Sequence, residues 1–264
     1  MNALAAFYAG YSSLVLFAGV AALLALSVYG TLMAGQLSLG NAALAAIGGY
    51  TAAILTRDLH VALWPAVLAG AAVATAVAVV IGIPSLRLRG IYLALATLAF
   101  GEVVRAAALN LKITGGALGL IGIPALAGFW QVYGALVAAA FFFYRLERSR
   151  VGRAFAAIRE DEAAAQAMGI KVTHYKVLAF AIAGCLAGVA GGLSVHFTYV
   201  ITPSQASFTE AVNILTFAIV GGTSTFAGPI AGGILLTVLP ESLRVLRDYR
   251  LLLDGAILMV VTIY

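Results

Sequence analysis

The chain has 264 residues, of which 63% are hydrophobic and 9% are charged, and its formal net charge is +5. Soluble domains carry about 25% charged residues, so the composition excludes an ordinary soluble protein and predicts an all-α, polytopic membrane protein. Because lysine and arginine mark the cytoplasmic loops of such proteins, the positive charge bears on orientation in the lipid bilayer, and we expect no nucleic-acid partner.

Apolar runs recur along the chain and predict eight or nine spans in a single transmembrane domain, residues 1–264. About 20 apolar residues cross the hydrocarbon core, and several runs are shorter than this or interrupted by glycine, which predicts broken helices. The first run lacks a basic start and is too long for a signal peptide, so we interpret it as a span. The runs lie at 12–34, 41–56, 61–84, 90–110, 128–144, 175–199, 209–222, 226–243 and 250–264.

The first interruption is GQLSLGN at 35–41, between the first two runs. A helix broken at membrane depth leaves backbone N–H groups without partners, which is tolerated only beside protein or a water-filled cavity. Ser38 or Asn41 can cap the next half-helix, whose positive end would face a substrate carboxylate. This interpretation puts Gln36, Ser38, Gly40 and Asn41 on a translocation path. The alternative is close glycine-mediated helix packing.

The fourth run contains an acidic residue, Glu102, in LAFGEVVR. An ionisable group inside a span is a functional candidate by default, and this would place Glu102 on the path. The competing interpretation is a structural ion pair with Arg105, one helical turn later on the same face.

The segment 145–176 holds seven of the 15 basic residues and is therefore predicted to be cytoplasmic. Counting spans back from it places 111–127 outside and 85–90 inside. On the same count three arginines near the C-terminus fall outside, against the rule. Either a span is miscounted, with a re-entrant piece near 203–225, or nearby acidic residues partly neutralise these arginines. They are Arg244, Arg247 and Arg250.

Within the basic segment, residues 151–168 are good helix formers, and Gly169 is placed to end the helix. Such a helix is too short and too charged to span; it either lies on the headgroups or docks into a groove on a soluble partner. The acidic run 160–162 favours docking, because anionic lipids repel acidic groups. Glu162 lies on the apolar stripe, where an uncharged residue is expected. The stripe consists of Phe155, Ile158, Ala165 and Met168.

Two stretches beyond the basic segment contain further path candidates. FTEAVNIL brings Glu210 and Asn213 close to the end of a run, where polar groups again indicate function. The second interruption, GGTSTFAGPIAGG at 221–233, is small and hydroxyl-rich and adds Thr223 and Ser224. Its composition is similar to that of the first interruption, as an internal structural repeat predicts.

Four stretches carry a family resemblance when they are read together: 35–55, 86–105, 148–170 and 220–233. They resemble the LivM-type permease subunit of branched-chain amino-acid ABC transporters, and the similarity runs from about Leu14 to the C-terminus. In ABC importers a cytoplasmic loop with an EAA-like pattern forms the coupling helix that sits on the ATPase subunit. Glu162-Ala163-Ala164 followed by Gly169 matches that pattern, with one extra residue before the glycine. The resemblance thus implies coupling roles for Gly152, Arg153, Arg159, Glu160, Asp161, Glu162 and Gly169.

The resemblance also implies a function and partners. The chain would be a permease subunit in the cytoplasmic (inner) membrane of a bacterium or archaeon, importing branched-chain or related hydrophobic amino acids by alternating access. It would pair with a second, LivH-like permease and two ABC ATPase subunits, which bind ATP and Mg. An extracytoplasmic binding protein would dock on loops around 57–63, 111–128 and 200–208. Urea, amides and aromatic acids are alternative solutes, because relatives in this superfamily are thought to carry them.

The residues also bear on two other function classes. An ion-gradient-driven secondary transporter would use Glu102 or Glu210 as a proton carrier. A membrane enzyme is disfavoured, because the sequence shows no hydrolase, metal-ligand or GxxxxGKS/T phosphate-binding motif. We therefore expect no cofactor on this chain and no enzymatic activity of its own. The chain ends at Tyr264 inside an apolar run, without the polar tail usual in the family, which suggests a partial reading frame.

Overall fold

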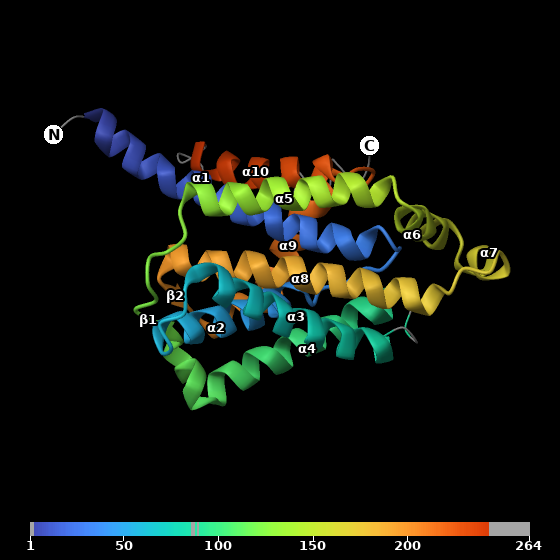
Figure 1. Cartoon of the computed structure of the whole chain (residues 1–264), viewed down its shortest axis with the longest axis horizontal. Coiled ribbons are helices and arrows are strands. Elements are labelled where there is room, and N and C mark those ends of the chain that lie inside the picture. Colours follow the sequence, from blue (N-terminus) through green and yellow to red (C-terminus); the bar gives the residue numbers. More distant parts are fainter. Residues whose placement is uncertain (1–2, 86–87, 89, 243–264) are drawn as a thin grey trace.

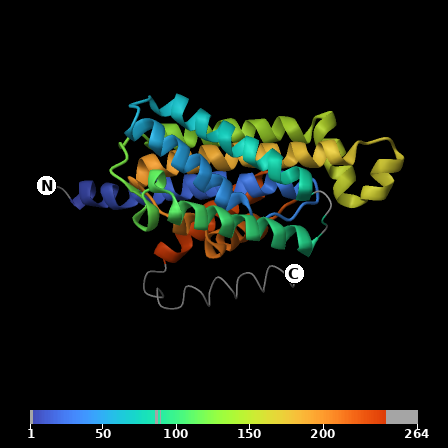
Figure 2. The same ribbon diagram turned by 90° about the horizontal axis from the view of Figure 1, so that it is seen from below.

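The computed structural model describes residues 3–85, 88 and 90–242, and this part of the chain is almost entirely α-helical (Figure 1). The long helices run side by side, and α6 and α7 project beyond them at one end, as Figure 2 also shows. The helices are α1 (Ala3–Leu32), α2 (Asn41–Arg57), α3 (Leu63–Ser85), α4 (Ile91–Asn110), α5 (Phe129–Glu147), α6 (Arg150–Glu160), α7 (Glu162–Ala167), α8 (Val172–Thr198), α9 (Phe208–Gly221) and α10 (Ala227–Ser242).

Helix boundaries follow the predicted apolar runs closely, because a run of apolar side chains is what lets a helix lie in lipid. Five of the described helices are long and apolar enough to cross a membrane, which confirms an all-α polytopic membrane protein. Three further runs form the shorter helices α2, α9 and α10. The ninth run, 250–264, and the three C-terminal arginines lie outside the described residues.

The connections between helices gather at two ends of the molecule (Figure 1). At the β1–β2 end, the loop before α5 contains η1 (Lys112–Thr114), η2 (Gly116–Leu118) and β1 (Leu120–Ile121). β1 pairs antiparallel with β2 (Val200–Ile201), which follows α8. At the opposite end, which we call the α6–α7 end, lie the two projecting helices. The predicted separation of 111–127 from the basic segment 145–176 therefore matches the fold.

The centre of the layer is held by close contact between the backbones of α2, α3 and α8. A Cβ atom built on Gly188 of α8 would lie 2.7 Å from Cα of Ala71 in α3. One built on Gly48 of α2 would lie 2.7 Å from the Gly188 carbonyl oxygen, and one on Gly191 would overlap the Ala45 backbone. Small residues let helices approach closely in lipid, where packing replaces the hydrophobic driving force. These glycines are thus packing positions.

The chain after α8 turns back into the helix layer. η3 (Pro203–Ala206) packs against the middle of α4, where a Cβ atom on Gly101 would lie 3.5 Å from the Ala206 carbonyl oxygen. α9 then begins inside the layer with 14 residues, a length of about 21 Å, whereas the hydrocarbon core is about 30 Å thick. The segment 203–225 nevertheless passes from the β1–β2 end to the α6–α7 end, where Thr223 lies beside Arg159 of α6, so it crosses the layer as η3 plus a short helix and is not re-entrant.

Substitution of Gly191 tests the close packing. We expect Gly191→Val to destabilise the detergent-solubilised protein by about 1–3 kcal/mol, the usual cost of overpacking, because the side chain meets the α2 backbone. Gly134→Ala on α5 is the matched control, since a Cβ atom there has nothing within 4 Å. Thermal unfolding followed by circular dichroism measures both variants. Equal melting temperatures for the two would contradict the packing role.

Candidate functional site

The segment 33–40 leads from the end of α1 back into the helix layer. The Leu39 backbone N–H donates to Thr97 Oγ1 of α4 at 2.9 Å. Asn41 Nδ2, at the start of α2, donates to Ser27 Oγ of α1 at 3.0 Å. Both partners lie more than one helical turn inside their own helices, so α2 begins within the layer. The predicted break between the first two runs is therefore present.

The predicted cap of α2 is wrong in detail. The residue at the N-cap is Gly40, with no side-chain cap, and Ser38 Oγ accepts from the Gly40 N–H at 3.2 Å rather than from α2. Asn41 is the first helical residue, and its amide is occupied by α1. Gln36 Oε1 and Asn41 Oδ1 are buried without a hydrogen-bond partner among the described residues. Buried polar atoms of this kind are normally satisfied by water.

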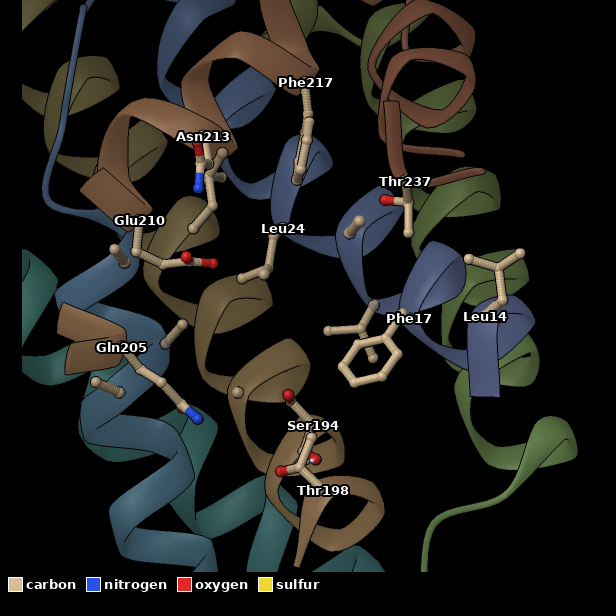
Figure 3. A pocket seen from close by; sticks show the side chains of 17 residues that line it. Leu14, Phe17, Leu24, Ser194, Thr198, Gln205, Glu210, Asn213, Phe217 and Thr237 are labelled. Carbon is tan, nitrogen blue, oxygen red and sulfur yellow. Dashed lines mark hydrogen bonds between the residues drawn. The ribbon is translucent and has the colours of Figure 1, made fainter. Parts of the chain in front are cut away.

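A cavity of about 430 Å³ opens between α1, α2, α8, α9 and α10 (Figure 3). In Figure 3 the Glu210 carboxylate and the Gln205 amide point into this space, and Leu24 and Phe17 of α1 lie on the other side. Polar and apolar side chains both occur on several walls: Thr237 lies on the same side as Phe17, and α9 carries Phe217 as well as Glu210. Its polar side chains are Ser194, Thr198, Gln205, Glu210, Asn213 and Thr237, and its large apolar ones are Leu14, Phe17, Leu24, Ile214 and Phe217.

The structure brings only part of the predicted path to this cavity. Glu210 and Asn213 lie on its wall. The four residues of the first interruption are not among its lining residues, although Ala42 of α2, next to them, is. Thr223 and Ser224 lie at the α6–α7 end, after α9 has ended. That placement reflects the direction of α9, which runs from the middle of the layer toward the α6–α7 end.

Two charged pairs lie away from the cavity. Arg105 Nε donates to Glu102 Oε2 at 2.7 Å on α4, which is the predicted ion pair, and α4 contributes no residue to the cavity lining. At the β1–β2 end, Arg57 Nε donates to Asp58 Oδ1 at 2.7 Å. This hydrogen bond lowers the pKa of the exposed Asp58 carboxyl. Such exposed pairs contribute little stability.

The predicted single helix over 151–168 is wrong, because the chain breaks at Asp161. This residue is extended, and its Oδ1 accepts from the N–H groups of Ala163 and Ala164 at 2.8 and 3.0 Å. Aspartate offers the backbone this alternative to a helix interior, so α6 ends at Glu160 and α7 starts anew. Gly169 has a positive φ of 84° and follows the end of α7, which confirms the predicted stop signal.

The break at Asp161 also changes the apolar stripe. Phe155 and Ile158 of α6 and Ala165 of α7 are buried, whereas Met168 is 84% exposed. Glu162 does not stand alone: its Oε2 accepts from Lys176 Nζ of α8 at 2.8 Å. Three of the four stripe residues thus anchor the projection to the rest of the chain, and Met168 faces outward.

Other residues of the projection divide between packing and exposure. Gly152 fits where a Cβ atom would overlap the Leu146 carbonyl oxygen, so α6 packs directly on the end of α5. Arg153 Nη1 donates to the Arg148 carbonyl at 3.2 Å. The Glu160 side chain is 78% exposed and lies 3.7 Å from Arg159 Nη2.

A carboxylate that the sequence analysis did not single out lies beside α6. Glu147, the last residue of α5, accepts two hydrogen bonds on Oε1, from Tyr29 Oη at 2.7 Å and from the Phe226 N–H at 2.8 Å. Its partners are far away in the sequence, so no local pattern indicates them. The one available signal is a lone acid at the end of an apolar run within the basic segment.

Arg159 of α6 joins the two interruptions at the α6–α7 end. Its Nη1 lies 3.4 Å from the Thr223 carbonyl oxygen, in the turn between α9 and α10. A Cβ atom on Gly35, which has a positive φ of 69°, would lie 3.1 Å from Arg159 Cα. The backbone therefore approaches α6 closely where only glycine fits without strain.

Comparison with known proteins decides the family. A family model described as the permease component of the branched-chain amino acid transport system matches residues 10–262. The chain belongs to this permease family. LivM of Escherichia coli K12 is 32% identical over 88% of the chain, and LivM of Salmonella typhimurium is 31% identical over the same share. The permease covers 63% of the length of both. The predicted LivM-type resemblance is confirmed.

The chain is also similar to LivH-type permeases over a shorter stretch. LivH of Salmonella typhimurium is 33% identical over 43% of the permease and 37% of its own length. No solved structure matches the permease. All of these curated relatives are described as parts of branched-chain amino acid transport systems.

The split of the projection is testable at Asp161. We expect Asp161→Ala to remove the cap of α7, at a cost of about 1 kcal/mol to that helix, and to speed backbone hydrogen exchange over 162–169. Asp161→Asn keeps a side-chain oxygen that accepts from the same N–H groups and should preserve protection. Hydrogen-exchange mass spectrometry of the purified permease measures both. Unchanged exchange in Asp161→Ala would contradict the capping role.

Proposed function

We propose that the permease is the transmembrane subunit of an ABC importer that moves branched-chain or related hydrophobic amino acids into the cell. Membership of the permease family supports this proposal, as does the absence of a phosphate-binding GxxxxGKS/T motif from the sequence. ATP and Mg would then be bound by two partner ATPase subunits. A LivH-like second permease and an extracytoplasmic binding protein would complete the transporter in the cytoplasmic membrane.

The observation that carries the coupling part of the proposal is the outward face of the α6–α7 projection. Phe155, Ile158 and Ala165 hold the projection to the chain, while Met168 is 84% exposed at its far side. A methionine adapts its shape to a groove on a partner. The neighbouring acidic residues Glu160 and Asp161 are exposed, and anionic lipid repels such groups. A soluble ATPase fits this surface better than the headgroups do.

Met168 provides a direct test of the docking surface. We expect Met168→Asp to lower co-purification of the ATPase subunits at least about tenfold, because a charge would enter an apolar groove at a cost of more than about 1.4 kcal/mol. The matched control is Leu118→Asp, which changes a 77% exposed residue at the β1–β2 end. It should leave ATPase co-purification intact.

Co-purification of Met168→Asp at the level of the unchanged permease would refute this surface. Glu162→Arg should also weaken ATPase docking and transport, since Glu162 belongs to the EAA-like pattern. This substitution is a less selective test, because it places a second cation beside Lys176, 2.8 Å from the present carboxylate. It therefore disturbs the anchoring of α7 together with the docking face.

The cavity supports an amino acid as solute. Glu210 is the single carboxylate among the residues that line it, and a carboxylate pairs with an ammonium group through strong, charge-assisted hydrogen bonds. Leu24 and Phe217 offer apolar surface for a branched side chain. Asn213 is exposed on α9, and polar groups at membrane depth face protein or water rather than lipid. We therefore place the solute path at this face of α9.

Glu210 of α9 and Glu102 of α4 make a matched pair of substitutions. We expect Glu210→Gln to lower leucine uptake by roughly tenfold or more, because a hydrogen bond to a charged group is worth about 1.5–3 kcal/mol. Glu102→Gln should leave uptake nearly unchanged, since Glu102 does not line the cavity. Radiolabelled leucine uptake into liposomes that contain the complete transporter measures both. A larger effect of Glu102→Gln would disprove the assignment of the path.

The same measurements address the alternative functions. Competition by unlabelled urea, short amides or aromatic acids identifies a different solute for the same path. An ion-gradient-driven transporter would keep Glu210 in the cavity as a proton carrier, so Glu210→Gln alone does not separate it from the importer. Uptake by the purified chain in liposomes under a pH gradient, without ATPase subunits or ATP, would overturn the importer proposal.

A further inference from the structure

We infer that Glu147 is a coupling residue through which movement of α6 reaches the walls of the cavity. The inference rests on the proposed function, because it assumes that a partner ATPase moves the α6–α7 projection. It concerns a residue and a set of contacts that take no part in the cavity or in the docking face.

The first step is the junction of α5 and α6. α5 ends at Glu147 and α6 begins at Arg150, so only two residues separate the helices. Ser149 caps α6 by accepting from the Gly152 N–H at 3.2 Å, and its own hydroxyl donates to the Leu146 carbonyl at 2.7 Å. Gly152 packs on the backbone of Leu146 and Glu147. Interiors packed this closely transmit displacement, so the end of α5 follows α6.

The second step is the pair of hydrogen bonds on Glu147 Oε1. One comes from the hydroxyl of Tyr29 in α1 at 2.7 Å, and the other from the backbone N–H of Phe226, immediately before α10, at 2.8 Å. Tyr29 is 2% exposed. One oxygen atom therefore holds two elements that are nearly 200 residues apart in the sequence. A displacement of Glu147 acts on both.

The third step leads from α1 and α10, the elements that Glu147 holds, to the cavity. α1 supplies Leu14, Phe17 and Leu24 to the cavity, and α10 supplies Thr237. The turn that contains Phe226 also ends the connection from α9, which carries Glu210. Both elements held by Glu147 thus form cavity walls. The opposite walls belong to α2 and α8, which are locked together by their glycine contacts.

Contacts of α6 itself act in the same direction. Arg159 Nη1 reaches the Thr223 carbonyl in the α9–α10 turn, and Arg159 Cα lies against Gly35 after α1. α6 therefore meets the ends of the same helices that Glu147 holds. The competing explanation is a purely structural role, in which Glu147 only stabilises the α6–α7 end. The two explanations differ in the effect of removing a single hydrogen bond on the amount of leucine taken up per ATP hydrolysed.

Substitution of two tyrosines distinguishes a coupling role of Glu147 from a purely structural one. Tyr29 Oη donates to Glu147 at the α6–α7 end, and Tyr133 Oη of α5 donates to the Val15 carbonyl of α1 at 2.9 Å toward the other end. Tyr29→Phe and Tyr133→Phe thus each remove one hydrogen bond between α1 and α5. The Tyr29 bond, made to a carboxylate, contributes more stability than the Tyr133 bond to a neutral carbonyl, so the comparison is made on leucine uptake per ATP and not on stability. Only the first lies on the inferred route from α6 to the cavity.

The experiment measures ATP hydrolysis and leucine uptake by the complete transporter in the same liposomes. We expect Tyr29→Phe and Glu147→Ala to lower uptake per ATP by roughly threefold or more, the scale set by one hydrogen bond, while ATPase co-purification persists. Tyr133→Phe should keep the ratio of the unchanged protein. Glu147→Gln should keep it as well, because the amide oxygen still accepts from both donors.

Each outcome decides the inference. Equal changes in the ratio for Tyr29→Phe and Tyr133→Phe, or an unchanged ratio in Glu147→Ala, would show a structural role and overturn it. If the unchanged transporter hydrolyses ATP and takes up leucine, such a result leaves the proposed function standing. If the unchanged chain neither binds ATPase subunits nor supports ATP-dependent uptake, the proposed function fails, and this inference fails with it.

Discussion

Backbone contact among α2, α3 and α8 is the constraint on which the rest of the molecule depends. In lipid, apolar side chains gain little by leaving their surroundings, so helices associate through close packing and hydrogen bonds. Gly48, Gly188 and Gly191 make that packing possible by leaving no side chain between the helices. The resulting slab fixes the positions of α2 and α8. α2 and α8 thus form a fixed wall of the cavity, and α1, α9 and α10 form the walls that face it.

Contacts with α1 and α4 explain how two helices can begin at membrane depth. α2 begins inside the layer because Thr97 and Ser27 supply hydrogen-bond partners from neighbouring helices. α9 begins inside it after η3 has packed against the middle of α4. Non-helical backbone is tolerated in a bilayer only where protein or water covers it. Both helix starts meet this condition, and Ala42 beside the first and Gln205 before the second line the cavity.

The sequence predicts the positions of the helices well, but it does not predict most of the contacts between them. Span boundaries follow from local hydropathy, and the ion pair of Glu102 with Arg105 follows from helical spacing. The break at Asp161 was missed because the flanking residues are all good helix formers, and only the cap geometry decides. Glu147 was missed because its donors, Tyr29 and Phe226, lie on other elements. The cavity draws residues from five helices, which no linear pattern combines.

The division of the projection at Asp161 has a consequence for how such permeases diversify. α6 contacts other parts of the chain through Gly152 and Arg159, whereas Met168, immediately after α7, faces outward. Under the proposed function, the residue that meets the ATPase and the residues that transmit its movement therefore belong to different parts of the projection. Under the proposed docking, the exposed residues of α7 and the turn after it can change to suit a different ATPase, whereas Ala165, Glu162 and the junction of α5 with α6 are held by contacts within the permease.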